Sequence, residues 1–318
     1  MKAAWLERIK NEDVVGLDFH HGHIVASHFL STQTGPKLER LAIGEYDLNA
    51  SDKERAAAIR ALWKKEKLPT RTVSTCLHSR ALVVRYFRYE NLNMDELPQA
   101  LALEAEEALQ CSSNNISMDW QLNPTAPNIG NQTTELSGTL VAAPRKTVVR
   151  HLKLVKSAGL YSIRIKASCS ALSNLYTFLN QNRPTTPTCL INLSEQTADI
   201  VMHSNGCNYP RTLFSASETW ENNQDYLLEN IQNALLYYHL KLKNPPIERI
   251  LLTGRIPESN GLIKKLAQET ALPIERLNLC DHPRLTCRSC SENKKPDGIC
   301  NVATGIGLGL KRSNYELV

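Results

Sequence analysis

Four cysteines near the end of the chain have the spacing of a metal-binding loop. Cys287 and Cys290 form a C-x-x-C pair, with Cys280 before it and Cys300 after it. Thiolates spaced in this way can close a tetrahedron around zinc and stabilise a loop that lacks a hydrophobic core. The segment therefore predicts a structural zinc site, and reduced thiols on a long surface loop are the alternative interpretation.

A run of histidines near the start of the chain is a second group of candidate metal ligands. His20, His21, His23 and His28 crowd one predicted hairpin, and His21 and His23 would project from the same face of a strand. Imidazole is a common ligand of transition metals. However, no partnering cysteine or carboxylate is evident nearby in the sequence, and histidine is also common at polar turns. We therefore interpret these residues as part of a turn.

The elements that carry these residues follow a pattern that occurs twice. Residues 13–27 are two β-rich runs joined by a polar turn, and residues 188–202 repeat the arrangement later in the chain. A predicted helix and a further strand follow each hairpin, the strands being residues 71–77 and 250–254. Ser51 and Glu54 form a capping box at the start of the first helix. The repeat predicts an α/β protein with two similar lobes.

Residues from about 80 to 160 are additional material that the repeat does not need. They contain predicted strands at 82–87, 116–122 and 135–142. One predicted helix is capped by Asp95, and another ends at Gly159. We expect a small inserted α+β subdomain, so that residues 1–186 form the first lobe with its insertion and residues 187–318 form the second.

Gly305, Gly307 and Gly309 imitate a dinucleotide-binding fingerprint close to the end of the chain. The fingerprint requires a strand directly before it, and none is predicted there. We expect that these glycines instead allow a terminal helix to pack closely against its neighbours.

Charge and hydropathy argue against two classes of protein. The 37 basic and 32 acidic residues are well mixed, whereas nucleic-acid binders gather Lys and Arg on one element. The apolar runs have the length of strands, far below the roughly 20 residues of a transmembrane helix, and the start has no secretory signal pattern. We expect a cytoplasmic protein that does not bind nucleic acid.

In their order and spacing, these elements resemble the PilM branch of the actin-like ATPase superfamily, which is related to FtsA and to the cytoplasmic part of the GspL secretion proteins. The segments that carry the resemblance are residues 15–18, 83–87, 94–109, 140–160, 251–254 and 302–308. The resemblance implies a two-lobed, ribonuclease H-like actin fold. It also implies a place at the cytoplasmic face of a type IV pilus or type II secretion platform, where such proteins bind the short cytoplasmic tail of a PilN-like membrane protein.

In that family the inserted subdomain helps to form the groove that holds the tail. We expect Leu82, Val84, Leu97 and Leu101 to line such a groove, with packing in the subdomain core as the competing role for them.

The resemblance also implies a nucleotide cleft between the lobes. In an actin-type site, two hairpin turns surround the phosphates with backbone N–H groups, and carboxylates at the strand ends hold Mg²⁺. The residues expected at this cleft are Asp18, His20, Asn192, Ser194, Thr197 and Gly254.

The cleft departs from the family pattern in all three motifs. Asp18 remains at the first turn, but His20 stands where a glycine is usual. At the second turn, Asn192 and Ser194 replace an aspartate and a glycine, and Arg255 stands where a second glycine would follow the last strand. Mg²⁺ depends on anionic oxygen ligands, so the loss of a carboxylate weakens its binding.

The combined interpretation is a pseudo-ATPase scaffold without catalytic residues, held at the inner membrane through its partner. We expect no bound cofactor. Weak binding of Mg-ATP, a structural zinc ion and self-association remain open alternatives. An active actin-like ATPase or sugar-kinase relative is the first alternative, and a zinc-stabilised adaptor is the second.

Overall fold

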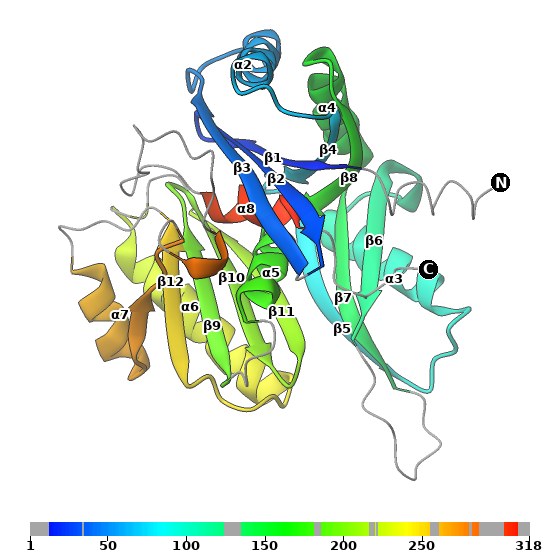
Figure 1. Ribbon diagram of the computed structural model, residues 1–318. Helices are drawn as coiled ribbons and strands as arrows, with labels where there is room; N and C mark the ends of the chain where they lie inside the picture. Colours follow the sequence, from blue (N-terminus) through cyan, green and yellow to red (C-terminus); the bar gives the residue numbers. More distant parts are fainter. Residues whose placement is uncertain are drawn as a thin grey trace.

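Three β-sheets organise the chain, which a computed structural model describes over residues 13–33, 35–123, 135–180, 186–215, 220, 222–254, 261–279, 282–285 and 302–310 (Figure 1). The first sheet consists, in order, of β3 (Gly35–Glu45), β2 (His23–Thr32), β1 (Val15–His20), β4 (Thr72–Leu77) and β8 (Tyr161–Ala167). The second consists of β11 (Cys207–Phe214), β10 (Thr197–Ser204), β9 (Thr188–Leu193), β12 (Arg249–Gly254) and β13 (Ile274–Arg276). The third consists of β5 (Val83–Glu90), β7 (Glu135–Pro144) and β6 (Ile116–Leu122).

The first two sheets have the same topology. In each, three antiparallel strands are followed by two strands that run parallel to the first one. This confirms the predicted duplication of lobes. The repeat is larger than predicted, because β3 and β11 extend each hairpin by a third strand.

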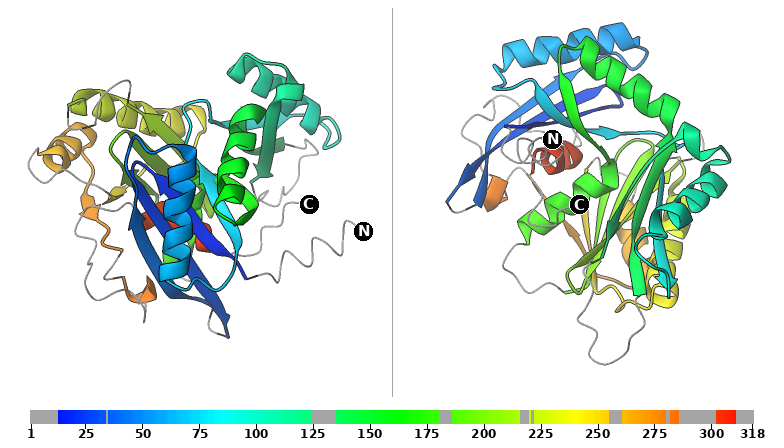
Figure 2. Two further views of the ribbon diagram at one scale, coloured as in Figure 1. Left: turned by 90° about the horizontal axis from the view of Figure 1, so that it is seen from above. Right: turned by 90° about the vertical axis from the view of Figure 1, so that its right-hand side faces the viewer.

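Helices cover the outer faces of the sheets and fill the space between them (Figure 2). The helices are α2 (Asp52–Lys65), α3 (Leu97–Leu109), α4 (Arg145–Ser157), α5 (Ser168–Leu179), α6 (Gln224–Leu236), α7 (Leu262–Thr270) and α8 (Val302–Gly309), with short turns η1 (Ser113–Asn115), η2 (Tyr237–Lys241) and η3 (Pro283–Leu285). The capping box at the start of α2 is present as predicted. Asp95 does not cap α3, which begins after Glu96 without a side-chain cap. In the described part of the chain, no helix has the length and apolar character needed to cross a lipid bilayer.

The inserted subdomain is smaller than predicted. Its sheet packs one face on α3, and Phe87, Leu101 and Leu140 form part of the shared core. The helix α4, which we expected to belong to it, packs beside α2 instead, with Leu154 and Val155 in the core of the first lobe. The insertion is therefore limited to the strands β5, β6 and β7 with α3.

The helices α5 and α8 lie between the two large sheets and join the lobes. One core cluster combines Phe29 and Leu38 of the first sheet, Leu172 of α5, Ile306 of α8 and Leu251 of the second sheet. Helix α8, which we assigned to the second lobe, thus contacts β1 and β2 of the first sheet. The division at residue 186 therefore does not describe how these two helices pack.

Close approach of α8 requires its glycines, as the sequence predicts. A Cβ atom at Gly307 would lie 2.6 Å from the carbonyl carbon of Ala171 on α5, and one at Gly16 of β1 would lie 2.7 Å from the carbonyl carbon of Leu308. Such distances are below any normal carbon–carbon contact. The backbone of α8 therefore touches β1 and α5 directly.

Replacement of Gly307 by alanine should destabilise the protein strongly, because the methyl group meets backbone that cannot move without separating α5 from α8. We expect a loss of about 3 kcal/mol in the free energy of unfolding, measured by urea denaturation. Gly44→Ala is the matched control, since its added Cβ would lie 3.3 Å from the flexible end of Leu62. Equal losses in the two variants would contradict the role given to α8.

Candidate functional site

The two predicted hairpin turns face each other across a small cavity between the lobes. Its lining comes from both lobes: Asp18, His20, His21, His23, Val25, His78, Ser194, Glu195, Thr197 and Asp199. Its volume is about 40 Å³, whereas sites for small molecules are usually about 300–1,000 Å³. The space between the two turns is therefore small, although a larger cavity of about 670 Å³ also borders the first turn at His20, His21 and Gly22.

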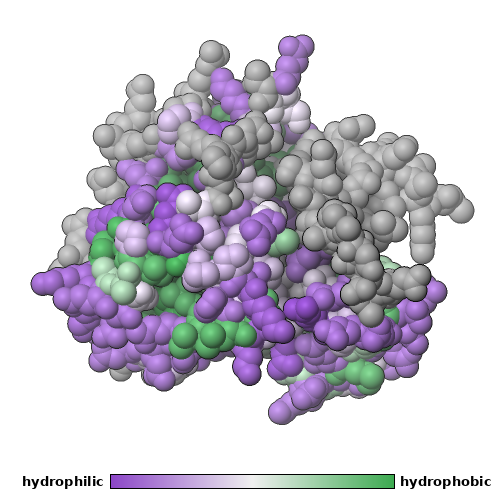
Figure 3. Space-filling model, turned by 90° about the horizontal axis from the view of Figure 1, so that it is seen from below, coloured by the Kyte–Doolittle hydropathy of each residue, from purple (hydrophilic) through white to green (hydrophobic). Residues whose placement is uncertain are grey.

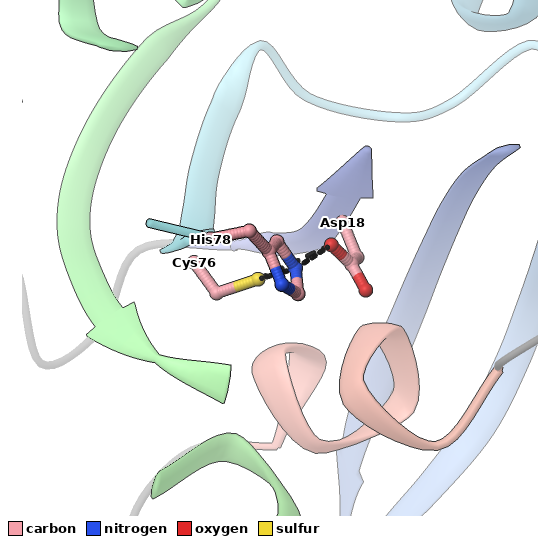
Figure 4. A group of neighbouring side chains, drawn as sticks. All are labelled: Asp18, Cys76 and His78. Carbon is pink, nitrogen blue, oxygen red and sulfur yellow. Dashed lines mark hydrogen bonds and ion pairs between the residues drawn. The ribbon is translucent and has the colours of Figure 1, made fainter. Parts of the chain in front are cut away.

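Asp18 is the centre of a buried side-chain cluster at the carboxyl ends of β1 and β4 (Figure 4). These strands are parallel neighbours, so Asp18 lies beside Cys76 and His78. His78 Nε2 is 2.7 Å from Asp18 Oδ1, and Cys76 Sγ is 3.2 Å from the same oxygen and 2.9 Å from His78 Nε2. The carboxylate that the family pattern assigns to a hydrated metal ion is thus engaged by two protein side chains.

The cluster is an ion pair beside a neutral thiol. Burial raises the pKa of Asp18, but the charge and hydrogen bond of His78 outweigh it, so the pKa of Asp18 is lowered overall. Burial likewise lowers the pKa of His78, and Asp18 outweighs it in the opposite direction. Burial, followed by the charge of Asp18, raises the pKa of Cys76 well above its usual value. These shifts favour the charged forms of Asp18 and His78 and the protonated thiol of Cys76.

Imidazole rings occupy the first turn where the family pattern has glycine. The rings of His20 and His78 stack with centroids 3.9 Å apart and planes 4° apart, and the ring of His21 lies against His20. Burial lowers the pKa of His20 far below its usual value, so this ring is neutral. Its Nε2 atom has no hydrogen-bond partner within the described ranges. The turn thus presents neutral rings to the cleft in place of exposed backbone.

The predicted residues of the second turn are only partly brought to the cavity. Ser194 and Thr197 line it and share a hydrogen bond across the turn. Asn192 is 1% exposed and donates to Thr304 Oγ1 at 3.5 Å. Gly254 has a φ of 87°, and a Cβ there would lie 2.7 Å from Asn192 Oδ1. Asn192 and Gly254 are therefore packed behind the turn, outside the lining of the cavity.

A carboxylate that the sequence did not single out also faces the cavity. Asp199 lies on β10 opposite Asn192 and accepts hydrogen bonds from Ser168 Oγ and Thr212 Oγ1, both at 2.6 Å. Burial raises the pKa of Asp199 in spite of these two hydrogen bonds. Its signal in the sequence was a single carboxylate among the apolar residues Ala198, Ile200 and Val201.

Cys76 and His78 were also missed, although their spacing carried a signal. They are two residues apart at the end of a strand and so project to the same side. Neither residue was singled out as a candidate from the sequence. Only the pairing of β4 with β1 reveals that both side chains meet Asp18.

The four residues proposed for a partner groove differ in accessibility. Leu97 and Leu101 lie on the inner face of α3 and are fully buried, so they pack the subdomain core and cannot contact a partner. Leu82 and Val84 are half-buried and reach the surface. The proposed zinc ligands Cys280, Cys287, Cys290 and Cys300 lie outside the described residues, as does Arg255.

Asp199→Asn should stabilise the protein at neutral pH. Because the folded state raises the pKa of Asp199 above its usual 3.8, the unfolded state loses this proton first as pH rises, and folding becomes less favourable. An amide removes that penalty and can accept the same hydrogen bonds. We expect Tm to rise by roughly 2–4 °C at pH 7, and the gain to shrink as pH falls toward 4.

Asp52→Asn is the control for this effect. The hydrogen bond from Arg150 lowers the pKa of Asp52, so its loss should lower Tm slightly at neutral pH. If Asp199→Asn lowers Tm at neutral pH, as Asp52→Asn is expected to do, Asp199 is not a carboxylate whose burial costs stability.

Comparison with known proteins places this geometry in a known fold. No family model and no curated protein matches the sequence. Among solved structures, a PilM–PilN type IV pilus biogenesis complex matches with a TM-score of 0.76 and 17% identity, over 94% of this chain and 98% of that one. A Bacteroides thetaiotaomicron protein of unknown function with an actin-like ATPase fold matches with a TM-score of 0.50 and 11% identity, over 88% and 94%. The chain therefore has the actin-like ATPase fold that the sequence predicted, in an arrangement similar to that of the PilM–PilN structure.

Proposed function

We propose that this protein is a PilM-like scaffold of a type IV pilus or type II secretion platform that binds the cytoplasmic tail of a PilN-like membrane protein. The observation that carries the proposal is the similarity of nearly the whole chain to a structure described as a PilM–PilN complex. A scaffold that works in this way stays in the cytoplasm and is held at the inner membrane by its partner.

The chemistry of the cleft supports a role without ATP hydrolysis. Asp18 is paired with His78, and the first turn presents His20 to the cleft at the position where the family pattern has its glycine. A triphosphate needs metal ions or backbone N–H groups to compensate its charge. The small cavity carries the neutral ring of His20 and a second carboxylate, Asp199, beside the Asp18–His78 pair, so it offers a triphosphate little such compensation. Lys146 and Arg55 line the larger cavity on the first lobe instead.

The junction between the insertion and the lobes is the proposed docking surface. The sheet face opposite α3 carries Val84, which pairs with Val141 of β7, and both are half-buried. Leu82 precedes this strand and donates its backbone N–H to Ser79 O at 2.9 Å.

A second cavity lies beside the first turn, against α2 and α4, and reaches the residues that lead into this junction. It has a volume of about 670 Å³, and Ser79 and Leu77 belong to its wall. This is within the usual range for a ligand site, so it can receive side chains of an extended tail. Lys146 and Arg55 also line it, which favours a tail with an acidic or carbonyl-rich anchor.

A separate surface suits self-association, which we keep as part of the proposal. Leu236, Tyr237 and Leu240 are exposed on α6 and η2, with Leu240 64% exposed. Figure 3 shows that hydrophobic areas stand among hydrophilic ones on the face seen from below. A second copy of the chain could cover such a surface.

Mg-ATP should not bind measurably. We expect isothermal titration calorimetry to give no saturable heat up to about 1 mM nucleotide, which corresponds to a binding free energy weaker than about −4 kcal/mol. Micromolar affinity that Asp18→Asn abolishes would instead support the active ATPase or sugar-kinase relative.

Val84→Glu should weaken binding of the partner tail, because the new carboxylate would lose its hydrating water when an apolar side chain of the tail packs on it. We expect at least a tenfold rise in Kd, or about 1.4 kcal/mol, for a labelled synthetic tail of a PilN-like protein, measured by fluorescence anisotropy. Leu103→Glu is the matched control, since Leu103 is 62% exposed on α3, on the other side of the subdomain. Unchanged binding by a folded Val84→Glu variant would remove this surface from the proposal.

A further inference from the structure

We propose that Asp18, Cys76 and His78 form a binding site for a divalent transition-metal ion, and that zinc is the ion whose chemistry fits best. The three donor atoms come from two neighbouring strands and lie within 4.8 Å of one another (Figure 4). This inference goes beyond the scaffold role, because it concerns the cleft and does not depend on the partner.

The way the donors meet distinguishes a metal site from a catalytic triad. In a nucleophile–histidine–carboxylate triad, the two partners contact different ring nitrogens, so that the ring relays a proton. Here Cys76 Sγ and Asp18 Oδ1 both approach Nε2 of His78, at 2.9 and 2.7 Å. Three donors that converge in this way surround a point, which is how ligands surround a cation.

The distances suit a small tetrahedral ion after a slight expansion. With Zn–S near 2.3 Å and Zn–N and Zn–O near 2.0–2.2 Å, ligand atoms in a tetrahedron are roughly 3.3–3.6 Å apart. The observed separations are 2.7, 2.9 and 3.2 Å. Side-chain rotations that move each donor by less than 1 Å would therefore admit the ion.

The type of donor selects the ion. An ion that binds here displaces the thiol proton of Cys76 and the ring proton of His78 to solvent, which leaves one thiolate and one neutral imidazole as ligands. These donors favour zinc and related transition metals over Mg²⁺ and Ca²⁺, which prefer oxygen ligands. The Mg²⁺ expected from the family pattern would be a poor match, since only Asp18 supplies oxygen.

The surroundings provide an orienting contact and an entry path. His20 stacks on the ring of His78 and fixes its plane. Asp18 and His78 line the small cavity, and Cys76 and His78 line the larger one, so an ion can reach the cluster from either side. Three protein ligands leave a fourth position open for water.

The test uses the full chain in which Cys280, Cys287, Cys290 and Cys300 are all replaced by serine, so that the terminal cysteines cannot bind metal. Cobalt(II) is titrated into this protein as a spectroscopic substitute for zinc. We expect one equivalent to bind with a thiolate-to-cobalt charge-transfer band, and zinc to compete with it.

Cys76→Ser in that background should abolish the charge-transfer band, and His78→Gln should weaken cobalt binding at least tenfold. Cys189→Ser is the matched control, because Cys189 is fully buried in the core of the second lobe, and it should leave the spectrum unchanged. Circular dichroism and thermal unfolding without metal establish that each variant is folded.

Two results would overturn the proposal. One is the absence of saturable cobalt or zinc binding to the folded background protein, which would leave the cluster as a hydrogen-bonded ion pair. The other is a charge-transfer band that persists in Cys76→Ser. Neither result concerns binding of the partner tail, so the scaffold role is tested independently of the metal site.

Discussion

The direct backbone contact of α8 with β1 and α5 is the constraint on which the other features depend. Gly305, Gly307 and Gly309 allow the helix to lie between the two sheets, where Ser27 Oγ donates to the carbonyl oxygen of Gly305 at 2.7 Å. The same helix meets β1 at Gly16, two residues before Asp18. The packing that joins the lobes therefore also fixes where the end of β1 lies relative to the second hairpin, and so determines the cleft.

Because this contact is made by backbone atoms and apolar side chains rather than by the polar groups of the cleft, the polar lining can change without loss of the fold. Glycines and a second aspartate at the turns serve a nucleotide, whereas the core of the lobes depends on buried apolar residues and on the glycines of α8. Imidazoles at the first turn and Asn192 at the second are compatible with the same sheets. The fold and the chemistry of the cleft are thus separate properties of this sequence.

Local signals predicted the fold well, and contacts between distant segments were what they could not supply. The hairpins, the capping box of Ser51 and Glu54, and the glycine-rich terminal helix all depend on residues close together in sequence. Helix α4 was placed in the insertion because its apolar stripe does not specify which core receives it. Asp18 and His78 are 60 positions apart, and their contact depends on the parallel pairing of β1 with β4, which no local pattern encodes.

The two carboxylates of the cleft show how the identity of a partner decides the behaviour of a buried charge. Asp18 and Asp199 are both buried, yet the pKa of Asp18 is lowered and that of Asp199 is raised. Asp18 faces a cation, whose charge compensates the loss of water, while Asp199 faces two hydroxyl groups, which compensate it only in part. A phosphate group entering between them would meet two negative charges, only one of which is balanced. Asp199 is therefore the carboxylate whose ionised form the fold disfavours, while His78 holds Asp18 in its ionised form.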